Sequence, residues 1–120
     1  MTPRAVIENY WKIECERRLE AILECFNEDA ELIVPGLGRL VGHDEIRRFY
    51  QESIDRFPRL EVKIVGAVEA ENRGAFEWRS RFHDHNGREY PLGGVNMVRI
   101  QNDRLQEVHL YYDPAEITAA

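Results

Sequence analysis

The sequence predicts an α+β fold, a cone-like curved antiparallel sheet with three helices that enclose a pocket. Hydrophobic residues recur mainly at helical spacing before Pro58, whereas beyond it they alternate with polar residues. Helices grouped before a run of strands are typical of α+β proteins and not of parallel sheets. A sheet that wraps around a pocket needs positions where its strands bend, and glycines allow this at Gly66, Gly74, Gly93 and Gly94.

Length and composition predict a single domain that spans residues 1–120. The net charge of −6 disfavours nucleic acid as a partner, because an acidic surface repels phosphate groups. No segment approaches the ~20 apolar residues of a membrane span, and the N-terminus has no apolar run of signal-peptide length. Cys15 and Cys25 lack the spacing of a metal site or a disulfide framework, so we expect a cytoplasmic protein with free thiols.

Two helices are expected at the start of the chain. Thr2 is a suitable N-cap for the first, because Pro3 follows it where a helix needs no amide hydrogen. Val6 and Tyr10 then recur at helical spacing. The second helix is predicted from apolar residues at positions i, i+3, i+4 and i+7, which are Leu19, Ile22, Leu23 and Phe26.

A short strand and a third helix follow. The strand covers residues 32–34, and the segment GLGRLVG is predicted to turn the chain after it. Asp44 is a suitable N-cap for the third helix, and Pro58 ends it because the residue before a proline avoids the helical conformation. The apolar side of this helix carries Ile46, Phe49, Tyr50, Ile54 and Phe57.

Four antiparallel strands are predicted after Pro58. We expect turns at residues 71–74, 101–103 and at Asn86-Gly87, a pair that is typical of a two-residue hairpin turn with φ > 0 at both positions. Alternation in the second of these strands predicts one face toward the interior and one toward solvent. The inward residues are Phe76, Trp78, Ser80 and Phe82, and the outward residues are Glu77, Arg79, Arg81 and His83.

Together with this order of elements, the stretches LEAILECFNEDAEL, GHDEIRRFY, GVNMVRI and LQEVHLYYD make the chain resemble the nuclear-transport-factor-2-like superfamily. The resemblance is strongest to its SnoaL-like and ketosteroid-isomerase-like members. It implies a pocket for a small ligand. It does not select one activity, because the superfamily includes isomerases, cyclases, dehydratases, epoxide hydrolases and non-catalytic binding proteins.

The ketosteroid isomerases imply three site positions. They use a tyrosine of the first helix and a protonated aspartic acid of the penultimate strand as an oxyanion hole, with an aspartate before the first strand's proline as general base. In this sequence those positions fall on Tyr10, Asn96 and Val34. The phenol and the amide are both hydrogen-bond donors and could stabilise charge on a carbonyl oxygen. Valine cannot accept a proton, so the base is left unassigned.

Six further residues are expected to line the pocket: Phe26, Val34, Trp78, Val108, Leu110 and Tyr112. For Trp78 two arguments conflict. Hydrophobic alternation turns it inward, whereas the isomerase register carried across Asn86-Gly87 would turn Glu77 and Arg79 inward instead. We follow the hydrophobic alternation, because a one-residue slip would bury charges.

These observations predict an isomerase-, cyclase- or dehydratase-type enzyme that acts on a small hydrophobic carbonyl compound, without a cofactor or a metal. One alternative is a module that binds a small apolar ligand without converting it, which a valine at the base position favours. A homodimerisation domain is a third possibility and is compatible with both. The outer sheet face that would form the dimer carries Glu77, Arg79, Arg81, His109 and Tyr111.

Overall fold

The computed structural model describes residues 1–118. The helices of this part of the chain are α1 (Pro3–Cys15), α2 (Leu19–Glu24), α3 (Gly42–Arg56) and α4 (Ala115–Thr118). Its strands are β1 (Phe26–Val34), β2 (Gly38–Val41), β3 (Arg59–Ala70), β4 (Arg73–His83), β5 (Glu89–Gln101) and β6 (Arg104–Tyr112). The predicted order of elements is present, with β2 and α4 in addition.

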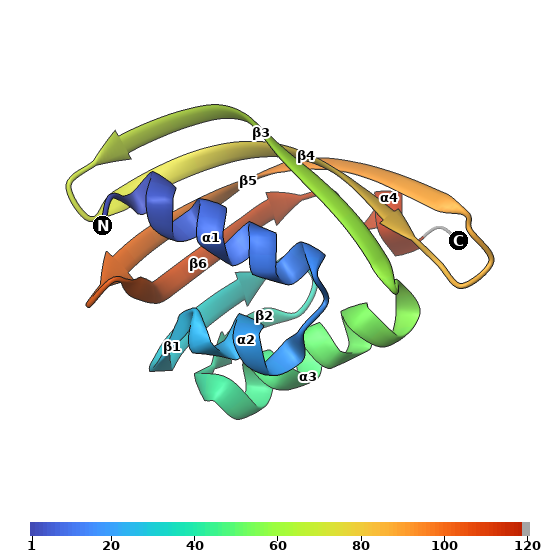
Figure 1. Cartoon of the computed structure of the whole chain (residues 1–120), viewed down its shortest axis with the longest axis horizontal. Coiled ribbons are helices and arrows are strands. Elements are labelled where there is room, and N and C mark those ends of the chain that lie inside the picture. The colour runs from blue at the N-terminus through green and yellow to red at the C-terminus, as the bar shows by residue number, and fades with distance from the viewer. Residues whose placement is uncertain (119–120) are drawn as a thin grey trace.

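The strands form one curved sheet in the order β2-β1-β6-β5-β4-β3, and α1 and α3 lie on its concave side (Figure 1). This arrangement confirms the predicted α+β fold. The sheet is mixed and not antiparallel throughout, because β1 runs parallel to β6 while the other neighbouring pairs are antiparallel. A parallel pair needs a long connection, and here β2, α3, β3, β4 and β5 lie between the two strands.

Helix α1 begins as the sequence predicts. The side chain of Thr2 accepts a hydrogen bond from the amide of Ala5 at 3.1 Å, and Pro3 occupies the first turn. The helix packs against β3, β4, β5 and β6. Tyr10 and Glu14 lie one turn apart on its buried side, so both are held between the helix and the sheet.

The segment that follows α2 differs from the prediction. Phe26 does not extend the second helix but begins β1, because it pairs with Leu105 of β6 and the amide of Leu105 donates to the carbonyl of Cys25 at 2.9 Å. The predicted turn GLGRLVG contains a strand. Gly36 and Gly38 have φ of +82° and +87°, and this left-handed backbone reverses the chain so that β2 pairs with β1.

Asp44 is not the N-cap of α3, contrary to the prediction. The N-cap is Val41, three residues earlier, and the helix begins at Gly42. The carboxylate of Glu45 accepts a hydrogen bond from the amide of Val41 at 2.8 Å and so satisfies one free donor at the start of the helix. Asp44 and Glu45 both lie in the first turn, where negative charge is favourable.

The hairpin between β4 and β5 is wider than a two-residue turn. Residues 84–88 form its loop, in which only Gly87 has positive φ, and Asp84 accepts hydrogen bonds from the amides of Asn86 and Arg88. The pairing therefore starts at His83 and Glu89. A two-residue turn at Asn86-Gly87 would shift the pairing of β4 with β5 by one residue. The register taken from the isomerases assumes such a turn, and for this reason it turned Glu77 and Arg79 of β4 inward in place of Trp78.

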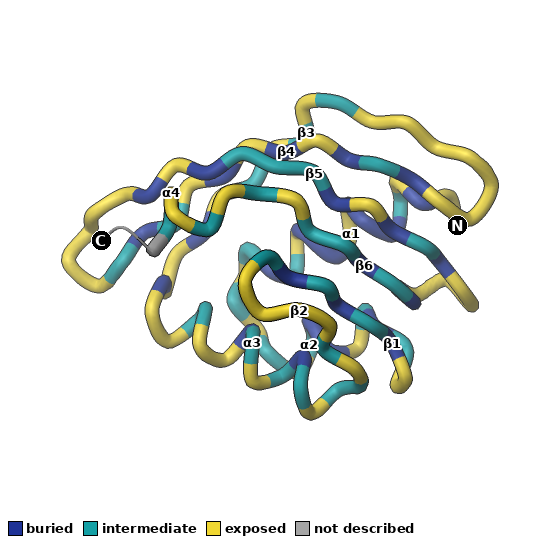
Figure 2. The backbone as a smooth tube through the Cα atoms, turned by 180° about the vertical axis from the view of Figure 1, so that it is seen from behind, coloured by how far each residue is buried: buried dark blue, intermediate teal, exposed yellow. Residues whose placement is uncertain are grey.

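Hydrophobic alternation gives the correct faces of β4. Phe76, Trp78 and Ser80 are buried, whereas Glu77 and Arg79 are exposed. Figure 2 shows the same alternation of buried and exposed residues along the neighbouring strands. His83, which was expected to point into solvent, is buried at the end of β4, because its ring bonds the carboxylate of Glu61 on β3 at 2.8 Å.

Candidate active site

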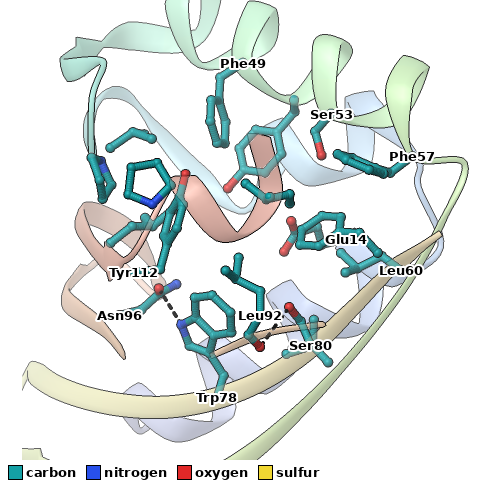
Figure 3. Close-up of a pocket in the computed structure, with 18 of the residues that line it drawn as sticks. Glu14, Phe49, Ser53, Phe57, Leu60, Trp78, Ser80, Leu92, Asn96 and Tyr112 are labelled. Atoms are coloured by element: carbon teal, nitrogen blue, oxygen red, sulfur yellow. Dashed lines mark hydrogen bonds between the residues drawn. The ribbon is translucent and has the colours of Figure 1, made fainter. Parts of the chain in front are cut away.

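A cavity of about 420 Å³ lies between the concave face of the sheet and helices α1, α3 and α4 (Figure 3). Its wall is mostly apolar and aromatic, and its volume is in the range of small-ligand sites. Within the described residues, the ionisable and amide side chains in the wall are Tyr10, Glu14, Tyr50, Glu52, Arg56, Asn96 and Tyr112.

The structure brings most of the predicted site residues together. Tyr10, Asn96 and four of the six predicted lining residues, Val34, Trp78, Leu110 and Tyr112, line this cavity. The other two, Phe26 and Val108, do not line it but are fully buried in the core.

Phe26 lies behind the wall of the cavity. Its ring packs between those of Tyr10 and Tyr50, with centroids 5.7 Å and 6.0 Å away. Val108 has the predicted inward direction on β6, but it pairs with Leu32 and Val98 in the middle of the sheet. The inward direction of a side chain, which strand alternation predicts, therefore did not distinguish a residue of the core from a residue that lines the cavity.

Asn96 presents a hydrogen-bond donor to the cavity. Its side chain is 4% exposed, and its carbonyl oxygen accepts a hydrogen bond from Nε1 of Trp78 at 2.9 Å (Figure 3). The indole nitrogen can only donate, so this bond fixes which end of the amide is the oxygen. The amide nitrogen donates to no other group in residues 1–118, so its hydrogens are available to a ligand.

Tyr10 is part of a buried chain of polar groups. Its hydroxyl forms a short hydrogen bond with the hydroxyl of Tyr50 on α3, and Glu14 lies one helical turn away on the same buried side of α1. Burial is the main cause that raises the pKa of both phenols well above the usual value. Both tyrosines therefore remain protonated and act as donors at neutral pH.

Glu14 places a carboxyl group in the cavity wall. Its side chain is 11% exposed, and burial raises its pKa, although the nearby side chains of Arg17 and Tyr10 oppose this effect. Nη1 of Arg17 lies 4.0 Å from Oε1 of Glu14. The same guanidinium donates to Oγ of Ser53 at 2.8 Å and to the carbonyl of Phe57 at 3.2 Å, so α3 and the segment after it hold it in place.

The sequence analysis did not identify Glu14 or Tyr50. A signal for Glu14 was available, because a residue four positions after Tyr10 lies on the same helix face. Tyr50 was assigned only to the apolar side of its helix, and nothing in the sequence paired its hydroxyl with that of Tyr10.

The site contains no candidate metal centre. Among residues 1–118, no three His, Cys, Asp or Glu side chains lie close enough together to hold a metal ion. In the same part of the chain, no helix has both the length and the apolar character that crossing a membrane requires.

A family profile described as the SnoaL-like domain matches residues 7–108, which is most of the chain. The chain belongs to the SnoaL-like domain family. This result agrees with the order of elements and with the pocket on the concave side of the sheet. No protein with a curated description matches this SnoaL-like sequence significantly.

Three solved structures place the SnoaL-like domain within the wider ketosteroid-isomerase-like fold. A proposed isomerase from Bacillus subtilis superposes with a TM-score of 0.86 at 14% identity, over 97% of this chain and 89% of that one. A ketosteroid-isomerase-like protein from Catenulispora acidiphila, in complex with trimethylamine, gives 0.84 at 15% identity, over 99% and 92%. A proposed SnoaL-like polyketide cyclase from Jannaschia sp. CCS1 gives 0.82 at 12% identity, over 98% and 90%. These identities establish a shared fold only.

Proposed function

We propose that this SnoaL-like domain is a cofactor-independent enzyme of the isomerase, cyclase or dehydratase type, and that its substrate is a small hydrophobic carbonyl compound. The observation that carries the proposal is the unpaired amide N–H of Asn96 in a mostly apolar cavity. A proposed isomerase and a proposed polyketide cyclase with the same fold support this class of reaction.

A donor in such a cavity favours a carbonyl oxygen. The wall is mostly apolar, and in such surroundings a fixed N–H group stabilises negative charge on oxygen more strongly than a fully solvated donor does. Asn96 is neutral and needs no perturbed pKa to remain a donor. Its oxygen is already bonded to Trp78, so the amide does not have to reorganise when charge develops on the ligand.

Tyr10 is the second donor in this proposal. Its hydroxyl has one proton and two neighbours, Tyr50 and Glu14. If Tyr50 donates to Tyr10, the proton of Tyr10 can serve either the carboxylate of Glu14 or an oxygen of the ligand. A carbonyl that becomes negative during the reaction would compete for this proton and draw it from Glu14.

Hydrogen exchange into an enolisable ketone tests the proposal. We would incubate 2-tetralone with the protein in deuterated water and follow loss of the α-proton signal by NMR. We expect exchange above the buffer rate, and Asn96→Ala should lower the enzymatic rate by about 10²–10³-fold, the usual cost of losing one oxyanion donor. Asn9→Ala, which removes an exposed amide from α1, should leave the rate unchanged.

Two results would contradict the proposal. Binding of 2-tetralone without any exchange would favour the alternative of a binding module. Equal exchange rates in the wild type and in Asn96→Ala would remove the oxyanion role of this residue.

We also propose that the protein forms a homodimer through the outer face of its sheet. Met97 and Tyr111 are 48% and 47% exposed on this face, and contiguous exposed apolar side chains mark candidate interfaces. The strand pairing places Met97 next to His109 and Val95 next to Tyr111, so the four residues form one patch, called here the outer patch. A second copy of the chain would cover it.

A further inference from the structure

We propose that Glu14 is the general base of the reaction and that Arg17 is the positioning residue that keeps it charged. This inference rests on the function proposed above and supplies the base that Val34 cannot provide. It is carried by three features of the structure: the place of Glu14 in the cavity wall, the separation of Glu14 and Arg17, and the position of Glu14 one helical turn from Tyr10.

Glu14 has the required access. Its side chain is almost entirely buried, yet it lines the same cavity as Asn96 (Figure 3). Figure 3 shows the carboxyl group and the amide projecting into this cavity from different walls, one from helix α1 and the other from the sheet. A ligand whose oxygen is bound at Asn96 therefore extends into the space that the carboxyl group faces.

Arg17 supports the charge of Glu14 without occupying its oxygens. Nη1 of Arg17 is buried and has no hydrogen-bond partner within residues 1–118. It lies 4.0 Å from Oε1 of Glu14, which is beyond hydrogen-bond distance but close enough for attraction between opposite charges. In an ordinary buried ion pair the guanidinium would hydrogen-bond the carboxylate. Here the lone pairs of the carboxylate remain free to accept a proton from a ligand.

The titratable groups that interact with Glu14 fit this role. The groups around it are Tyr10 on α1, Tyr50 on α3, Arg17 in the following segment, and the thiols of Cys15 and Cys25. Burial raises the pKa of each thiol to about 11, so both are neutral. The guanidinium of Arg17 is therefore the positive charge in this set, and glutamate is its counter-ion.

The proton transfer can be written with all electrons accounted for. A carboxylate oxygen of Glu14 takes the proton from the carbon next to the carbonyl, and the electrons of the C–H bond form a carbon–carbon double bond. The carbonyl π electrons move to oxygen, where Asn96 and Tyr10 donate hydrogen bonds. Because Glu14 is now neutral, it competes less for the proton of Tyr10. Return of the proton from Glu14 to the same carbon, with the electrons on oxygen re-forming the carbonyl, gives exchange. In a substrate with a double bond between the β and γ carbons the enolate is a dienolate, and return of the proton to its γ-carbon moves the double bond next to the carbonyl and completes an isomerisation.

The test uses the exchange of 2-tetralone protons in three Glu14 variants. Glu14→Gln should lower the enzymatic rate by about 10²–10⁴-fold, the usual contribution of a general base, while 2-tetralone still binds. Glu14→Asp retains a carboxylate and should keep part of the activity. Glu14→Ala should regain exchange when formate is added to fill the space. Glu8→Gln on the exposed side of α1 is the matched control and should behave as the wild type.

Arg17→Gln tests the positioning role. Arg17 lowers the pKa of Glu14, so its loss should move the acid limb of the pH–rate profile to higher pH. If Arg17 has only a structural role, its loss should reduce the rate at every pH without moving the acid limb of the pH–rate profile. That result would overturn the positioning role of Arg17.

The outcomes separate this inference from the proposed function. If the wild type exchanges the protons and Asn96→Ala does not, but Glu14→Gln retains the full rate, then Glu14 is not the base and the proposed function stands. If Glu14→Gln fails to fold, the absence of formate rescue in a folded Glu14→Ala would equally overturn the role. If the wild type binds 2-tetralone and shows no exchange, both proposals are wrong.

Discussion

At the scale of single residues, the burial of Glu14 carries a cost that can be measured. Its pKa is raised in the folded protein, so the folded state binds a proton more tightly than the unfolded state does. For such a group the favourable contribution to stability is fully present below the unfolded pKa and is lost as the pH rises through the folded pKa. The ionised form needed for catalysis is therefore the less stable form of the folded chain.

Glu14→Gln should accordingly stabilise the protein at neutral pH. Glutamine has the shape and neutrality of the protonated acid, so the melting temperature of the variant should exceed that of the wild type above the folded pKa. The difference should shrink as the pH falls toward the unfolded pKa. Thermal unfolding measured over a pH series checks this, with Glu8→Gln as an exposed control. A variant that is less stable than the wild type at neutral pH would mean that the Arg17 pair outweighs the burial cost.

The bond between Trp78 and Asn96 gives a second prediction at this scale. Trp78→Phe removes the donor that orients the amide and leaves the buried oxygen of Asn96 without a partner. We expect a loss of about 1–3 kcal/mol in the free energy of unfolding, measured in urea. Trp11→Phe is the matched control, because Trp11 lines the same cavity but donates no hydrogen bond within residues 1–118. Equal losses in the two variants would show that ring volume, and not the hydrogen bond, is responsible.

At the scale of elements, two adjacent glycines in β5 have different roles. A Cβ on Gly94 would collide with the backbone oxygen of Tyr111 and would lie 2.7 Å from Cζ2 of Trp78. A Cβ on Gly93 would meet only the flexible end of Arg79, on the outer face. Gly94 therefore leaves the space in which the indole of Trp78 packs against β5 and reaches Asn96.

Gly94→Ala should destabilise the protein by about 1–3 kcal/mol, as expected for overpacking, and should weaken binding of 2-tetralone by displacing Trp78. Gly93→Ala should have little effect on either property, because Arg79 can move into solvent. Urea unfolding and ligand titration of the two variants provide the measurement. Similar effects at both positions would mean that backbone freedom of β5, and not the space next to Trp78, explains the glycines.

Most elements could be predicted from the sequence because their signals are local. Capping by Thr2 and Pro3 and the alternation in β4 depend on neighbouring residues, and both are present in the structure. The errors arise where contacts with distant residues decide. Phe26 belongs to a strand because β6 pairs with it, and β2 exists because β1 is beside it. The loop at residues 84–88 is wider than Asn86-Gly87 indicates, because Asp84 caps two of its amides.

The candidate site was predictable only in part for a related reason. The resemblance to the isomerases named Tyr10 and Asn96, which line one cavity, but it offered Val34 for the base. A carboxyl group on another element can enter the same cavity, and an alignment of motifs does not search for it. Glu14 is recognisable once α1 is placed across the sheet, because its position one turn from Tyr10 then becomes a position in the wall.

At the scale of the whole molecule, the curved sheet separates two surfaces with different uses. The concave face, α1 and α3 enclose the cavity, whereas within residues 1–118 no helix covers the convex face (Figure 1). The alternation of side chains along β5 and β6 links the concave and convex faces, because each residue that points into the cavity has chain neighbours that point outward. Asn96, in the cavity, is flanked by Val95 and Met97 of the outer patch. An interface on the convex face would thus hold the strand that carries the proposed oxyanion donor.

Met97→Glu should therefore disrupt the proposed homodimer and also affect the site. In a two-fold interface each patch faces the same patch of the second copy, so both introduced carboxylates would be buried without a partner in an apolar contact. We expect a loss of about 2 kcal/mol or more in association, which is roughly 30-fold in Kd. Sedimentation velocity over a concentration series measures this, with Val41→Glu as the control, because Val41 is equally exposed but lies on the edge strand β2. A wild type that remains monomeric at every concentration would refute the dimer, and the outer patch would then be simply exposed.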